Sequence, residues 1–64
     1  MKYSDMYEEA KYAAAGNWKD GGVGSYSFKD LTVQYRLNGN KVHITLKGKR
    51  VPIELAHHYL VNNS

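Results

Sequence analysis

Apolar and polar residues alternate along the middle of the chain, and this alternation predicts a β-meander. Over residues 31–36 and again over residues 41–46, every second side chain is aliphatic or aromatic. Such alternation is typical of strands with one buried face and one face in water. Between the two runs lies Asn38-Gly39, which suits a two-residue type I′ turn. The two runs therefore predict an antiparallel hairpin.

The position of this turn sets the register of the hairpin. It pairs the apolar residues with one another on one face, as Tyr35–Val42, Val33–Ile44 and Leu31–Leu46. It pairs the polar residues on the other face, as Arg36–Lys41, Gln34–His43 and Thr32–Thr45. A shift of one residue would mix the two faces, so the pattern favours this register over its neighbours.

A second turn signal, Gly48-Lys49, suits a type II′ turn with Gly in its first position. Closing it adds a third strand, which pairs Leu46–Val51, Ile44–Ile53 and Val42–Leu55 on the apolar face. On the polar face the same register pairs Lys47–Arg50 and His43–Glu54. The prediction for residues 31–55 is a three-stranded antiparallel meander.

The C-terminal segment fits two structures. Residues 51–55 alternate as a strand, and Pro52 is tolerable on an edge strand because no partner there needs its missing amide. Residues 52–61 also fit a helix with Pro52 in its first turn. We prefer a strand to about Leu55, followed by a short helical turn over residues 56–61, and leave strand against helix open for residues 52–61.

An amphipathic helix is predicted over residues 4–15. Ser4 or Asp5 can cap its N-terminus, and Gly16-Asn17 offers a C-terminal stop. Apolar and small side chains recur at helical spacing as one stripe, which consists of Tyr3, Met6, Tyr7, Ala10, Ala13 and Ala14. We expect this stripe to cover the apolar face of the sheet, with its Ala end close to the backbone beneath.

The connection from the helix to the meander is rich in glycine. Residues 19–24 predict a mobile loop. Residues 25–28 alternate again between polar and apolar side chains. A tight turn at Lys29-Asp30 would make them a fourth strand, and a β-bulge or a bent single strand fits the pattern nearly as well. The prediction for residues 1–64 is a single small α+β domain, with an N-terminal amphipathic helix packed on a three- to four-stranded antiparallel β-meander.

Composition limits the chemistry of this domain. Sixty-four residues allow only a thin core, and the chain has no cysteine, which excludes disulfides and thiolate zinc sites. His57 and His58 are adjacent and cannot place both rings on one face, so no metal site and no cofactor are predicted. No apolar run approaches the roughly 20 residues of a membrane span, and we expect a cytoplasmic protein without a membrane partner.

The sequence also lacks the motifs of common catalytic sites. No serine is framed by glycines, no Asp belongs to a recognisable triad, and Glu8 and Glu9 are helix neighbours that point apart. We therefore expect a protein that is not an enzyme.

Positive charge is concentrated in the meander. The net charge is +3, and residues 31–64 hold five Lys and Arg against Glu54 alone, whereas residues 1–30 hold four Lys against five Asp and Glu. Clustered cations attract phosphate, and Arg, Lys and Gln can read base edges in a major groove. The polar face therefore predicts a nucleic-acid-binding surface that consists of Gln34, Arg36, Lys41, His43, Thr45, Lys47 and Arg50, with Lys49 at the second turn.

Two architectural resemblances bear on this prediction. A meander backed by a helix resembles DNA-binding domains that read DNA with a sheet, which implies contact through the polar face. The order of helix, strands and short helix is similar to that of the double-stranded-RNA-binding domain. The second helix of that family is basic and Ala-rich, whereas residues 56–64 contain no Lys or Arg.

The alternative function is that of a small interaction protein. Surplus aromatic side chains at Tyr12, Trp18 and Tyr59 could anchor a protein partner, because such rings are favoured at interfaces. Proteins of this size are often encoded by phages and other mobile elements to modulate a host protein. Such an interaction protein could act as a homodimer formed through an edge strand or the Tyr-rich helix. An acidic protein surface could also occupy the basic face.

Overall fold

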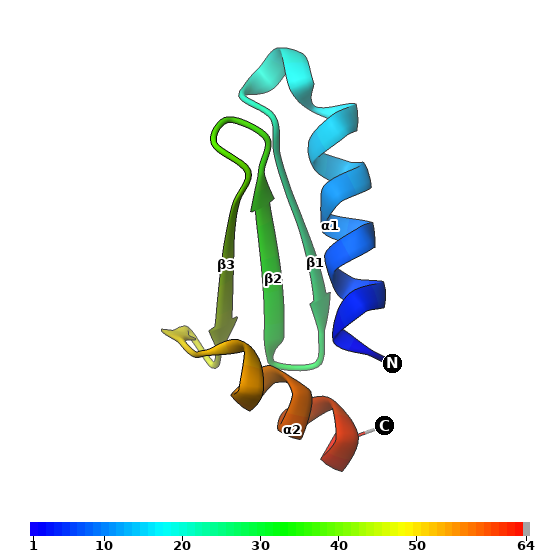
Figure 1. Cartoon of the computed structure of the whole chain (residues 1–64), viewed down its shortest axis with the longest axis vertical. Coiled ribbons are helices and arrows are strands. Elements are labelled where there is room, and N and C mark those ends of the chain that lie inside the picture. The colour runs from blue at the N-terminus through cyan, green and yellow to red at the C-terminus, as the bar shows by residue number, and fades with distance from the viewer. Residues whose placement is uncertain (64) are drawn as a thin grey trace.

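The computed structural model describes residues 1–63 and has two helices and a four-stranded antiparallel sheet, with the N-terminal helix alongside the first strand and the C-terminal helix at the ends of the strands (Figure 1). The helices are α1 (Tyr3–Gly16) and α2 (Ile53–Asn63), with a 3-10 turn at Trp18–Asp20. The strands are β1 (Val23–Phe28), β2 (Leu31–Arg36), β3 (Lys41–Leu46) and β4 (Lys49–Arg50), in the order β1-β2-β3-β4. The α+β class is thereby confirmed. Neither helix within residues 1–63 has the length and apolar character needed to cross a membrane.

The central hairpin has the predicted register. Strands β2 and β3 pair Val33 with Ile44 and Arg36 with Lys41, and every intermediate pair agrees. The predicted type I′ turn at Asn38-Gly39 is wrong, because positive φ falls on Gly39 (+87°) and Asn40 (+50°) instead. The alternation of the strands, and not the turn type, therefore sets the register here.

Strand β1 is longer than predicted. Its pairing with β2 joins Phe28 to Leu31 and Tyr26 to Val33, which confirms the fourth strand and the Lys29-Asp30 turn. The prediction that residues 19–24 form a mobile loop is wrong at its C-terminal end, where β1 already begins at Val23. The Leu37 amide donates to the Gly22 carbonyl over 2.9 Å and extends the ladder.

The second turn lies one residue earlier than predicted. Positive φ at Lys47 (+53°) and Gly48 (+85°) is the sign pattern of a type I′ turn, and it pairs Leu46 with Lys49 and Thr45 with Arg50. The predicted pairs Lys47–Arg50 and Leu46–Val51 are therefore wrong by two residues. A two-residue shift keeps each side chain on its face, so the division into two faces survives.

The C-terminal segment is a helix. Strand β4 ends at Arg50, and the predicted strand to Leu55 is wrong. Pro52 has no amide to continue the ladder, and its carbonyl accepts the amides of Leu55 (3.1 Å) and Ala56 (3.3 Å) at the start of α2. The helix buries Ala56 and Leu60. It also removes Glu54 from the sheet, so the predicted His43–Glu54 pair does not form.

Helix α1 begins earlier than predicted. Its N-cap is Lys2, and neither Ser4 nor Asp5 occupies that position. Asp5 instead accepts the backbone amide of Lys2 over 3.3 Å, as an acidic residue in a first helical turn can. The predicted apolar stripe faces the sheet.

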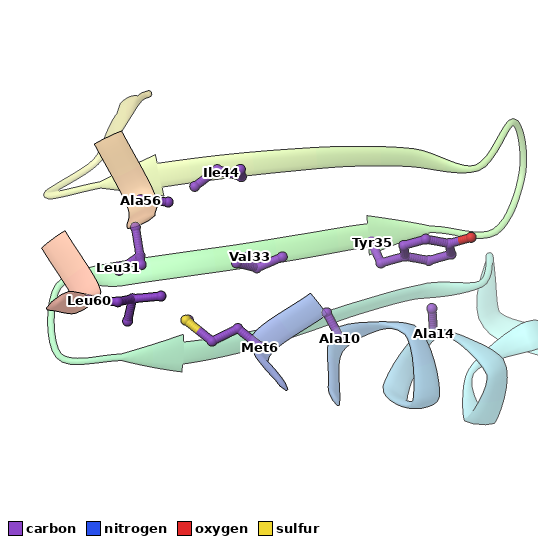
Figure 2. Close-up of a cluster of buried hydrophobic side chains, with 9 residues drawn as sticks. All are labelled: Met6, Ala10, Ala14, Leu31, Val33, Tyr35, Ile44, Ala56 and Leu60. Atoms are coloured by element: carbon purple, nitrogen blue, oxygen red, sulfur yellow. The ribbon is translucent and has the colours of Figure 1, made fainter. Parts of the chain in front are cut away.

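The core lies between α1, α2 and one face of the sheet, hereafter the covered face (Figure 2). Its buried residues are Met6, Ala10, Ala14, Leu31, Val33, Tyr35, Ile44, Ala56 and Leu60. Figure 2 shows Met6, Ala10 and Ala14 of α1 directed at β1 and β2, while Ala56 and Leu60 of α2 lie over the Leu31 end.

Gly24 permits the closest contact between α1 and the sheet. A β-carbon at this position would lie 2.5 Å from the Ala10 carbonyl oxygen and closer still to the Ala14 amide nitrogen. The helix and the strand thus meet backbone to backbone, because the small side chains of Ala10 and Ala14 leave no spacer between them.

We predict that Gly24→Ala lowers the free energy of unfolding by at least about 2 kcal/mol, because the added methyl group must displace helix backbone. Gly16→Ala is the matched control, since its β-carbon would meet nothing within 4 Å. Thermal and urea unfolding followed by circular dichroism measure both variants. Equal stability of the two variants would contradict the contact at Gly24.

We predict that Lys47→Asn raises the free energy of unfolding by about 0.5–1 kcal/mol. Lysine is strained at positive φ, whereas Asn-Gly is a preferred type I′ pair. Lys49→Asn removes the same charge at a residue without positive φ and is expected to give no gain. Urea unfolding measures the free energy of unfolding of both variants. An equal change in the two would contradict a turn centred on Lys47-Gly48.

Candidate nucleic-acid interface

The face of the sheet opposite the helices, hereafter the open face, is built from three cross-strand rows. The antiparallel register and the alternation of side chains place the rows as Val23–Arg36–Lys41, Ser25–Gln34–His43 and Ser27–Thr32–Thr45–Arg50. None of these ten side chains is buried, and both helices bury their apolar residues on the covered face. The open face is therefore a solvent-accessible polar surface.

Three cations on this face have uncompensated charge. Arg36, Lys41 and Arg50 are exposed, and their side chains make no ion pair or hydrogen bond with residues 1–63. No residue of β1, β2, β3 or β4 is acidic. The nearest carboxylate in the register belongs to Asp30, whose carbonyl accepts the Lys47 amide beyond the third row. The positive potential of the open face thus rests on three free side chains.

Neutral hydrogen-bonding groups occupy the space between these cations. The hydroxyl groups of Ser27 and Thr32 bond to each other across β1 and β2 over 2.8 Å. The side chains of Gln34, His43 and Thr45 have no hydrogen-bond partner among residues 1–63. They are therefore able to bond to a ligand without breaking an internal bond.

The structure brings most of the predicted binding residues together. Six of them share the open face: Gln34, Arg36, Lys41, His43, Thr45 and Arg50. Lys47 lies in the turn beyond the third row, and Lys49 lies opposite Leu46, on the covered side of the sheet. The predictions of Lys47 on the polar face and of Lys49 in the turn are therefore wrong, because the turn lies one residue earlier than expected.

Sequence reasoning also omitted several members of this face. Ser25, Ser27 and Thr32 lie in its rows, together with the partly buried Val23. Thr32 was on the polar side of the predicted hairpin, and the alternation of residues 25–28 was a signal for the two serines. Val23 gave no such signal, because the glycines around it indicated a loop.

The predicted partner-binding aromatic residues divide into two kinds. Tyr12 and Trp18 are 70% and 66% exposed. Tyr59 is half-buried against the core, and its hydroxyl oxygen accepts the Asp30 amide over 3.3 Å. The Lys29 ammonium donates to the Asn63 carbonyl nearby, over 3.1 Å. Tyr59 thus links α2 to the β1–β2 turn, and its ring is not available to bind a protein partner.

The histidines of α2 lie on a different surface from His43. His57 packs beside the Tyr3 ring with 5.5 Å between centroids, and burial, with a smaller contribution from Tyr7, raises the pKa of Tyr3. An open hollow of about 380 Å³ is lined by Glu54, His57, His58 and Val61, all from α2. Within residues 1–63 no three His, Asp or Glu side chains are grouped so that they could hold a metal ion.

We predict that Tyr59→Ala lowers the free energy of unfolding by about 2 kcal/mol, less than for a fully buried ring because Tyr59 is half-buried. Tyr12→Ala, the matched helical control, is expected to change it by no more than about 0.5 kcal/mol. Urea unfolding measures both. A larger loss for Tyr12→Ala would contradict the assignment of Tyr59 to the core and of Tyr12 to the surface.

The geometry of the open face is the basis for any assignment of function to this chain. Comparisons with protein-family models, with curated proteins and with solved structures gave no match. The charges, exposure and register of the chain's own residues are therefore the indications of its function.

Proposed function

We propose that this chain is a non-enzymatic nucleic-acid-binding protein and that the open face of its sheet is the binding surface. The observation that carries the proposal is the set of three exposed and unpaired cations, Arg36, Lys41 and Arg50, on a face whose strands contain no carboxylate. Phosphodiester oxygens are suitable partners for such cations, since Arg and Lys donate charge-assisted hydrogen bonds to them.

The number of cations sets the expected strength of binding. Three phosphate contacts give a slope of about −3 for the logarithm of affinity against the logarithm of salt concentration. Affinity should then fall about 50-fold between roughly 50 mM and 200 mM salt. Gln34, His43 and Thr45 add neutral hydrogen bonds that depend much less on salt. The proposal thus describes a binder of moderate affinity with marked salt dependence.

We predict that Arg36→Glu lowers affinity for nucleic acid about tenfold at low salt and makes the salt slope less steep by at least about 1, because one phosphate contact is lost and repulsion is added. Lys11→Glu makes the same charge change on an exposed residue of α1, on the other side of the sheet, and is expected to alter affinity by no more than about twofold.

Fluorescence anisotropy measures these affinities with labelled DNA and RNA of mixed sequence across a salt series. Circular dichroism melts establish that both variants are folded. Absence of binding to every nucleic acid at about 25 mM salt, where electrostatic attraction is little screened, would contradict the proposal. Equal losses for Arg36→Glu and Lys11→Glu would also contradict it, because affinity would then follow net charge and not the open face.

A second candidate function is capture of a protein partner, which the exposure of Tyr12 and Trp18 favours. Amphipathic rings bury a large area at little entropic cost, and they serve as anchors in many interfaces. Both residues lie outside the sheet, so their replacement by Ala should leave nucleic-acid binding unchanged. This candidate predicts a partner whose binding is lost in that double variant and depends little on moderate salt.

A further inference from the structure

The cations of the open face lie at its two ends. Arg36 and Lys41 are cross-strand partners in the first row, whereas Arg50 lies in the third row opposite Thr45. The two rows are four residues apart along β2 and β3, which corresponds to about 13 Å at the usual rise of a strand. The row between them, Ser25–Gln34–His43, contains no Arg or Lys. Positive charge is thus divided between two ends with a neutral band between them.

No Phe, Tyr or Trp side chain lies on the open face within the strands. Tyr26 and Phe28 of β1 and Tyr35 of β2 are on the covered face, where Tyr35 is buried and packs edge-on against Tyr7 of α1. Proteins that bind single strands usually stack the bases on exposed aromatic rings in a basic groove. The open face offers hydrogen-bond donors and cations, but its one aromatic ring is the His43 imidazole, and a single ring is no platform for successive unpaired bases.

A duplex matches this distribution of charge better than a single strand. It presents two phosphate strands with a groove between them, and the major groove of B-form DNA is about 12 Å wide. Its bases are already stacked on one another and need no aromatic platform. The separation between the cationic rows is similar to this width, while the neutral band would face the groove.

Resting on the proposed function, we propose that the open face binds duplex DNA across a groove. Arg36 and Lys41 contact one phosphate strand and Arg50 contacts the other. Both ends of the face are needed for full affinity toward the duplex. A flexible single strand needs only one end and gains nothing from the fixed spacing between the two.

The test measures anisotropy at about 50 mM salt, a concentration at which three phosphate contacts still contribute strongly. The probes are a labelled DNA duplex of mixed sequence, each of its single strands, and an RNA duplex of the same sequence. The variants are Arg36→Gln with Lys41→Gln for one end and Arg50→Gln for the other. Lys11→Gln on α1 is the matched control, and circular dichroism melts verify folding of each protein.

We expect the unaltered protein to bind the DNA duplex at least about fivefold more tightly than either single strand, since only the duplex engages both ends. Arg50→Gln should weaken duplex binding by about fivefold and lower the steepness of the salt slope by about 1, with a smaller effect on single strands. The double variant should lower the steepness by about 2, and Lys11→Gln should change neither quantity.

The outcomes separate this inference from the proposed function. Binding to none of the probes overturns both. Equal affinity for the duplex and its single strands overturns the inference alone, as does an Arg50→Gln variant that behaves like Lys11→Gln. Equal or tighter binding to the RNA duplex also overturns it, because the major groove of A-form RNA is deep and narrow.

Discussion

The backbone contact between α1 and β1 at Gly24 is the constraint on which the arrangement of this protein depends. A side chain larger than hydrogen at this position would force Ala10 and Ala14 away from the strand. With the helix held there, Met6 reaches the space between the layers and belongs to the same buried cluster as Val33. One face of the sheet is covered in this way, and the opposite face remains open to solvent.

The sequence predicts the central hairpin well but cannot decide the second turn. Alternation constrains both β2 and β3, so only one register keeps their faces intact. At the second turn, a turn centred on Lys47-Gly48 and one centred on Gly48-Lys49 both give Gly48 a positive φ. The two turns shift the strand pairing by two residues, which leaves the strand side chains on the same faces. Alternation therefore cannot choose between them. The pattern of residues 53–60 likewise cannot decide between strand and helix. The helix α2 is favoured by the burial of Ala56 and Leu60 against the rest of the fold, which local sequence does not show.

Register also determines how much of the candidate site the sequence predicts. Residues on β2 and β3 were assigned to the correct face because their register was determined by alternation. The sequence misplaces Lys47 and Lys49 because their positions depend on the turn. Ser25 and Ser27 lie outside the predicted surface because the sequence leaves a fourth strand open against a bulge over residues 25–28. Val23 lies outside it because the neighbouring glycines indicate a loop, whereas Gly24 serves close packing. The open face is thus a consequence of the fold, and its cations are free because no carboxylate lies within the strands.

The central claim is that the open face, and not the outer surface of α1, contacts nucleic acid. The most direct measurement is a titration of isotope-labelled protein with a short DNA duplex, followed by amide and side-chain chemical shifts in NMR spectra. We expect the largest shifts at Arg36, Lys41 and Arg50, with Tyr12 and Trp18 unchanged. Shifts confined to Tyr12 and Trp18, or none at low salt, would contradict this account.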